Sequence, residues 1–163
     1  MIFISHSSEE TKEIAKKILK RFKRNNIFSL EGELGGGKTT FVKGVADFFL
    51  IKNKIKSPTF VIMKKYDIKC KIQNLKHKNK KQNLKLSKIK SSGFKNLYHF
   101  DCYRIKNPKE ILDLGWEEII KNSQNVFFVE WGDKIKNILP KRTIHIKFKF
   151  LNENERKIIL KKI

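Results

Sequence analysis

The sequence predicts a three-layer α/β fold, with a central, mostly parallel β-sheet between helices. Short apolar runs typical of buried strands alternate with amphipathic stretches typical of helices. A glycine-rich loop follows the apolar run 26–31 and precedes the helix-like stretch 40–49, which places it at the carboxyl end of a strand. The length of 163 residues is sufficient for one domain with its own core, spanning residues 1–163.

The N-terminal part is predicted to form a short strand and a helix. Residues 2–5 are an apolar strand candidate. The sequence S-S-E-E at residues 7–10 matches a capping box, with Ser7 as the N-cap and the Glu10 side chain reaching back. The helix that follows places Ile14 and Ile18 on one apolar face.

The glycine-rich loop carries a phosphate-binding motif. Residues 32–39 read G-E-L-G-G-G-K-T, which matches G-x-x-x-x-G-K-[ST]. Glycines permit positive φ and close backbone approach, so successive N–H groups can point at phosphate oxygens. Lys38 can reach the β- and γ-phosphates and the Thr39 hydroxyl can bind Mg²⁺. We therefore expect a P-loop NTPase-like domain whose nucleotide contacts include Gly35, Gly36 and Gly37.

The middle of the chain is predicted to contain two strands, an insertion and a helix. Residues 57–66 predict a strand that is entered through a rigid Ser-Pro turn, and residues 97–104 predict another. Between them, the Lys-, Asn- and Gln-rich residues 67–96 predict a surface insertion. Asn107 is the expected N-cap of the next helix, with proline at its first position.

The C-terminal part is predicted to contain three strands. Residues 125–131 form a nearly continuous apolar run that ends in a carboxylate, as a buried parallel strand would. Residues 143–150 and 156–163 flank an N-E-N-E turn, which predicts an antiparallel hairpin at the end of the chain.

Three acids follow predicted strands and are candidates for holding a metal ion. They are Glu31, Asp101 and Glu130. The carboxyl ends of parallel strands converge on the ligand crevice of an open α/β sheet, so Asp101 and Glu130 are expected at the site, whereas Glu31 directly precedes the loop and is less free. Further candidates are His99, which shares a face with Asp101, together with Thr59, Arg104 and Trp131.

The chain is strongly basic, with a formal net charge of +22. Residues 68–96 hold ten lysines and no acid, yet the rest of the chain is also basic. Either a polyanion such as RNA is a partner, or a biased genome has enriched surface positions in lysine. The two cysteines lack C-x-x-C spacing, no apolar run is long enough to span a membrane, and no signal peptide is visible, so a cytoplasmic location is expected.

Four ordered motifs resemble one family, the bacterial TsaE (YjeE) proteins. These motifs are the glycine loop, then S-P-T-F at residues 57–60, then Y-H-F-D-C-Y-R at residues 98–104, then E-W at residues 130–131. Two features depart from the family pattern. The family is usually short where this chain has its lysine-rich insertion, and the E-W pair is followed here by Gly132 and Asp133.

The resemblance implies a small Mg²⁺-dependent ATPase that helps TsaB and TsaD to make threonylcarbamoyladenosine in tRNA. Slow turnover is expected, because the sequence offers no evident arginine finger or strong base beyond Arg104. It implies that Lys38, Thr39 and Thr40 hold phosphate and metal, with Glu130 in the Mg²⁺ shell. Asp101 would be the Walker-B-like acid that supports hydrolysis, and Thr59 would lie on a switch segment. The nearest matches to the residues that frame the adenine are Ser7, Thr11 and Arg156.

Two other functions are compatible with the same loop. A nucleoside or small-molecule kinase would use it, but such kinases usually carry an arginine-rich lid, and lysine is the poorer bidentate phosphate ligand. A basic RNA-binding module with a vestigial nucleotide site is the second alternative, and its RNA affinity would fall steeply with salt.

Overall fold

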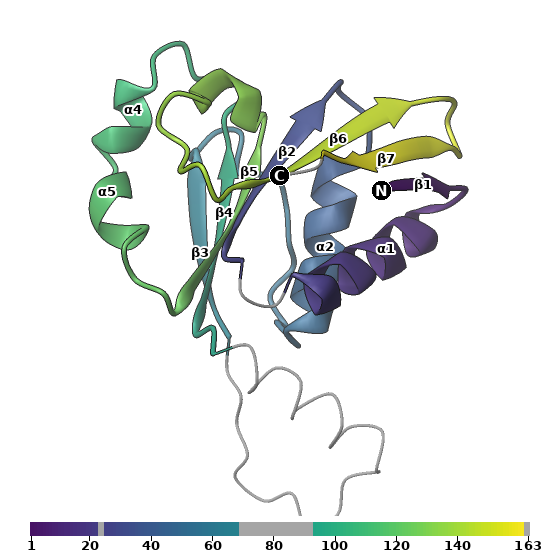
Figure 1. Ribbon diagram of the computed structural model, residues 1–163, viewed down its shortest axis with the longest axis horizontal. Helices are drawn as coiled ribbons and strands as arrows, with labels where there is room; N and C mark the ends of the chain where they lie inside the picture. Colours follow the sequence, from purple (N-terminus) through teal and green to yellow (C-terminus); the bar gives the residue numbers. More distant parts are fainter. Residues whose placement is uncertain (23–24, 69–92, 162–163) are drawn as a thin grey trace, which may run out of the picture.

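The computed structural model describes residues 1–22, 25–68 and 93–161, and its centre is a seven-stranded sheet in the order β1-β7-β6-β2-β5-β4-β3 (Figure 1). Strands β6, β2, β5 and β4 are parallel, whereas β1, β7 and β3 pair antiparallel to their neighbours. The bounds are β1 (Ile2–Ser5), β2 (Ile27–Gly32), β3 (Met63–Asp67), β4 (Asn96–Asp101), β5 (Asn125–Glu130), β6 (Ile144–Phe150) and β7 (Arg156–Leu160). The predicted α/β class, the parallel centre and the C-terminal antiparallel hairpin are confirmed.

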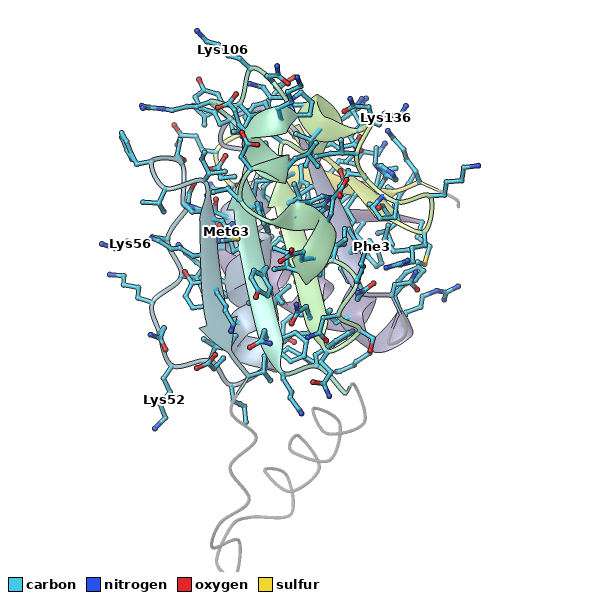
Figure 2. The ribbon with its side chains drawn as sticks, turned by 90° about the vertical axis from the view of Figure 1, so that its left-hand side faces the viewer. Phe3, Lys52, Lys56, Met63, Lys106 and Lys136 are labelled. Atoms are coloured by element: carbon cyan, nitrogen blue, oxygen red, sulfur yellow. The ribbon has the colours of Figure 1, made fainter. Side chains whose placement is uncertain are left out.

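Helices lie on both faces of the sheet. On one face α1 (Ser8–Arg21) and α2 (Lys38–Phe48) enclose a core that includes Phe28, Phe41 and Phe128. On the other face α4 (Lys109–Leu112), α5 (Trp116–Ile119) and the 3₁₀ turn η2 (Gly132–Ile135) cover a second core around Phe127 (Figures 1 and 2). Within the described ranges, no helix has both the length and the apolar character needed to cross a membrane.

The start of helix α1 differs in one contact from a regular capping box. The Ser7 hydroxyl accepts a hydrogen bond from the Glu10 N–H at 3.1 Å, as predicted. The Glu10 carboxylate, however, accepts from the His6 N–H at 2.6 Å instead of the Ser7 N–H. Helix α4 begins one residue later than expected, although Asn107 still accepts from the Lys109 N–H at 3.0 Å.

The predicted strand at residues 57–66 is wrong in its first half. Strand β3 begins only at Met63, and residues 57–62 form a turn in which the Val61 N–H donates to the Pro58 carbonyl at 2.9 Å. Ile62 takes a φ of 59°, which directs the chain out of the turn and into the strand. Most of the predicted insertion at 67–96, namely residues 69–92, lies outside the described residues. Its ends belong to the fold, since Asp67 closes β3 and Asn96 opens β4.

Candidate functional site: a phosphate loop facing two carboxylates

The phosphate loop connects the end of β2 to the start of α2. Gly32 has a φ of +125°, and a Cβ at this position would lie 2.0 Å from the carbonyl oxygen of Phe148, so only glycine fits there. Gly37 is the N-cap of α2 with a φ of 95°, which directs the first turn of the helix toward the loop. The first N–H groups of a helix have no acceptor within the helix. The loop and the helix start therefore present backbone N–H donors to the same concavity, an arrangement that suits an anion.

Lys38 lies over this loop and is almost completely buried. Its Nζ donates to the carbonyl oxygens of Gly32 and Glu33, each at 2.7 Å, and lies 4.0 Å from the centre of the Trp131 ring. Burial lowers the pKa of the Lys38 ammonium below its ordinary value, and the nearby carboxylates, led by Glu130 and Asp101, oppose that change. The side chain is thus held beside the place where the loop would bind phosphate.

Thr39 and Glu130 meet across the pocket. The Thr39 hydroxyl lies 2.8 and 2.9 Å from the two carboxylate oxygens of Glu130, which is itself only 3% exposed. The parallel register of β4 and β5 places Asp101 directly opposite Glu130, so the two predicted acids occupy neighbouring positions at the same edge of the sheet. The convergence expected from the strand ends is present in the structure.

His99 supports Glu130. Its ring is fully buried, and Nε2 lies 2.7 Å from Glu130 Oε1, whereas Nδ1 has no hydrogen-bond partner among the described residues. A proton on Nε2 lets the ring donate to the carboxylate and leaves only a lone pair unmatched on Nδ1. The structure thus places the carboxylate of Glu130 against the ring of His99.

Asp101 binds the segment that precedes β3. Its Oδ2 accepts from the Thr59 hydroxyl at 2.7 Å and from the Ser57 hydroxyl, and its Oδ1 accepts from the Tyr103 N–H at 3.0 Å. These two hydroxyls hold residues 57–59 against the site. Strand β3 starts late because its register, with Met63 opposite Phe100, leaves the residues before Ile62 beyond the end of β4 at Asp101. Ser57 was not among the predicted site residues, although it begins the S-P-T-F motif, because the motif alone does not show that its hydroxyl contacts Asp101.

A pocket of about 360 Å³ lies between these groups. Most of the predicted residues line it: Gly35, Gly37, Lys38, Thr39, Thr40, Thr59, Asp101 and Glu130. Leu34, Ser57 and Tyr103 line it as well and were missed as site residues, and Trp131 forms a further part of the wall. Gly36 is in the loop, where its N–H donates to the Glu33 carbonyl at 3.2 Å, but it is not on the pocket wall.

Of the three residues expected around an adenine, Thr11 and Arg156 lie beside Gly37 of the loop. Arg156 Nη1 donates to the buried Thr11 hydroxyl at 3.3 Å, and Arg156 Cδ would be 3.1 Å from a Cβ placed on Gly37. The Nε of Arg156 is buried without a hydrogen-bond partner in the described part of the chain. Ser7 is the N-cap of α1. None of these three lines the pocket, although Thr11 and Arg156 adjoin the loop.

Three other polar residues of interest face elsewhere. Glu31 is directed to the opposite face of the sheet, where it binds His145 Nδ1 at 2.6 Å and Lys161 Nζ at 2.8 Å. Arg104 is exposed, with its guanidinium 4.3 Å from the Phe60 ring centre, and it does not line the pocket. Cys102 is not an available nucleophile, since burial, assisted by Asp101, raises the pKa of its thiol to about 12.

The chemistry of this pocket fits a nucleotide with Mg²⁺. The hydroxyl of Thr39 and the carboxylate of Glu130 are the oxygen donors that Mg²⁺ prefers. In the described residues no group of three or more His, Cys, Asp or Glu side chains forms a metal cage. Magnesium sites in nucleotide-binding proteins take few protein ligands, because substrate phosphates and waters complete the octahedron.

Comparison with known proteins agrees with this geometry. A family model described as "Threonylcarbamoyl adenosine biosynthesis protein TsaE" matches residues 5–158. The chain belongs to the TsaE family. It is 35% identical to the tRNA threonylcarbamoyladenosine biosynthesis protein TsaE of Rickettsia typhi over 158 residues, which cover 96% of this chain and 92% of that protein. The Bacillus subtilis protein of the same name is 36% identical, over 92% of this chain and 78% of its own length.

A solved structure extends the match of this TsaE family member to three dimensions. The "Crystal structure of Bacillus subtilus YdiB" superimposes with a TM-score of 0.66 at 30% sequence identity, and the match covers 98% of this chain and 83% of that chain. The family match spans the phosphate loop, Thr59, Asp101 and Glu130, so the residues that form the pocket all lie within the part of the chain shared with TsaE relatives.

Proposed function

We propose that this TsaE family member binds and slowly hydrolyses ATP in the cytoplasm, in support of threonylcarbamoyladenosine modification of tRNA. It would act with TsaB and TsaD and would not itself perform the transfer. The observation that carries this proposal is the meeting of the phosphate loop with Asp101 and Glu130 in one pocket of a TsaE chain. Relatives that match most of the chain are named for this biosynthesis.

The loop amides and Lys38 would bind the phosphates, and Thr40 lies on the same wall. Thr39 and Glu130 would hold Mg²⁺, which supplies positive charge to the phosphate oxygens during hydrolysis. Because Lys38 now donates to the loop's own carbonyls, its ammonium needs only a small reorientation to reach an anion in the loop. Thr11, Arg156 and Ser7 would lie nearest the adenine.

Asp101 and Thr59 would link the phosphate to the surface of the protein. The Thr59 hydroxyl lines the pocket and donates to Asp101, so a γ-phosphate or attacking water beside Thr59 would compete for that hydrogen bond. Phe60, which follows Thr59 directly, is exposed, so a movement of Thr59 in the pocket would also move a side chain on the protein surface. No arginine of the described chain lines the pocket, which fits slow turnover without a partner.

The test compares Lys38→Ala with Lys43→Ala, an exposed lysine of the same helix. Loss of the phosphate-binding ammonium should weaken ATP binding by at least about tenfold, equivalent to about 1.4 kcal/mol, and should remove Mg²⁺-dependent phosphate release. The Lys43 variant should behave as the unmodified protein, because it undergoes the same change of charge outside the pocket. Equal ATP affinity and turnover in the two variants would refute the proposal.

The proposed partnership needs a separate measurement. Purified TsaB and TsaD should be retained by the immobilised chain in ATP and released in ADP, since Thr59 and Asp101 connect the γ-phosphate site to the surface. Equal retention of TsaB and TsaD in ATP and ADP would contradict the proposed nucleotide switch. No retention in either nucleotide would contradict the proposed partnership. Phosphate transfer to an added nucleoside would instead support the kinase alternative.

A further inference from the structure

Among the residues that the structure describes, one half of the sheet has helices on only one face. Strands β6, β7 and β1 pack their inner side chains, such as Ile146, Phe148 and Ile158, against the core under α1 and α2. Figure 1 shows α4 and α5 over the other half, on the side of β4 and β5, and η2 lies against β2, where Gly132 adjoins Ser29. The outer face of β6, β7 and β1 therefore has no covering helix among the described residues. We call it the open face.

Side-chain alternation fills the open face with basic and aliphatic groups. Its basic members are His145, Lys147, Lys149, Lys157 and Lys161, and its aliphatic members are Ile2, Ile4 and Ile159. Strands β6, β7 and β1 contain no Asp or Glu. The neighbouring acid, Glu31 of β2, is already held by His145 and Lys161.

Three of these lysines lack an internal counter-charge. Within the described part of the chain, no salt bridge joins Lys147, Lys149 or Lys157 to an acid. The register sets Lys149 directly opposite Lys157, an arrangement of like charges that destabilises a sheet unless an anion lies over it. Lys147 and Lys149 are two residues apart, so their Cα atoms are about 7 Å from each other along the strand.

Aliphatic side chains continue the open face to the edge strand. Ile2 is 61% exposed and Ile4 is 44% exposed, and the register places Ile2 beside Ile159 and Ile4 beside Lys157. The face is thus an open, ridged surface with a row of ammonium groups and an apolar border. A partner that fits it carries regularly spaced negative charges together with less polar surfaces, as the phosphates, sugars and bases of a nucleic acid do.

We propose that the open face binds the phosphate backbone of RNA. The choice of RNA over another polyanion rests on the proposed function in tRNA modification, whereas the surface itself follows from the strands. Its lysines belong to β6 and β7 and do not line the nucleotide pocket. RNA binding here is therefore expected with or without ATP.

The test removes three charges from the open face and three from elsewhere. The face variant is Lys147→Gln, Lys149→Gln and Lys157→Gln in the full chain. The matched control is Lys17→Gln, Lys52→Gln and Lys54→Gln, which are exposed lysines of α1 and of the segment after α2. Figure 2 shows Lys52 directed into solvent, away from the sheet. Fluorescence anisotropy of a labelled tRNA is measured over a series of salt concentrations.

Each phosphate contact contributes about 0.9 to the slope of log affinity against log salt for a duplex, so the face variant should lose about 2–3 from that slope. The control should lose less than about 1, because it changes only the general field. Equal losses in the two variants would overturn the proposal in favour of global charge. An unchanged slope in the face variant would overturn it in favour of another RNA site.

Two further measurements distinguish RNA binding at the open face from the proposed ATP hydrolysis and from binding to a membrane surface. The face variant should keep its ATP hydrolysis and Lys38→Ala should keep its RNA binding, so either proposal can fail alone. Vesicles with a high content of anionic lipid test a membrane surface as the occupant. If the face substitutions abolish vesicle binding and leave tRNA binding unchanged, the open face is a lipid-binding surface and the proposal is wrong.

Discussion

Replacement of His99 by leucine tests how the carboxylate of Glu130 is held. His99 is fully buried, and its Nε2 lies 2.7 Å from Glu130 Oε1. Leucine fills a similar volume but donates no hydrogen bond, and Glu130 would keep only Thr39 as a partner from this group. The histidine therefore acts as a positioning residue that works through Glu130.

Two opposed effects set the change in the free energy of unfolding that His99→Leu causes. Loss of a hydrogen bond to a charged group costs about 1.5–3 kcal/mol. Removal of the ring also removes the unpartnered Nδ1, and relief of one buried acceptor is worth about 1 kcal/mol. The free energy of unfolding should thus fall by about 0.5–2 kcal/mol in His99→Leu. His99→Gln should lose less, because its amide N–H₂ can still donate to the carboxylate.

The assay combines chemical denaturation with a titration of Mg²⁺-dependent ATP binding. A mobile Glu130 should raise the Mg²⁺ concentration at half-saturation in His99→Leu, with partial recovery in His99→Gln. Phe100→Leu is the control. Phe100 lies on the same strand as His99 but packs in the core on the other face of the sheet, so its substitution leaves the Glu130 contacts intact. Equal stability of His99→Leu and the unmodified protein, or an equal Mg²⁺ shift in Phe100→Leu, would refute the reasoning.

Two further substitutions test the packing and the charges of the fold. In Gly44→Ala, the new Cβ would lie 2.5 Å from Lys12 Cα and 2.6 Å from the Lys12 carbonyl oxygen, so α1 and α2 must separate. Overpacking costs about 1–3 kcal/mol, which exceeds the gain of about 1 kcal/mol in helix propensity from Gly to Ala. Thermal unfolding of Gly44→Ala should therefore show a lower Tm. An unchanged or higher Tm would contradict the close approach of α1 and α2. The substitution Glu31→Gln removes a carboxyl group with a shifted pKa. Burial tends to raise the pKa of Glu31, but the hydrogen bonds and charges of Lys161 and His145 bring it below its ordinary value of 4.5. A lowered carboxyl pKa stabilises the fold at pH values above 4.5. The free energy of unfolding of Glu31→Gln should therefore be below that of the unmodified protein at neutral pH, and the difference should shrink as the pH falls below 4.5. A difference that persists in acid would exclude this cause.

Local features of the sequence were sufficient for most elements and for the phosphate loop. Glycine spacing, capping residues and apolar runs act over a few residues, so the start of α1, the loop and strand β5 were predicted close to their observed bounds. The segment 57–62 was predicted wrongly because it extends beyond the end of β4, and its hydroxyls bind Asp101, a residue more than forty positions away. No local pattern contains that contact.

The sequence by itself determined that this chain has a glycine-rich loop with a phosphate-binding motif and acids at strand ends, because motif and strand are encoded in adjacent residues. Only the tertiary structure decided which acids face the loop. Neighbouring residues of a strand point to opposite faces, so Glu130 meets Thr39 on the α2 side whereas Glu31 meets His145 on the other. That choice depends on strand order and register, which arise from packing across the whole sheet.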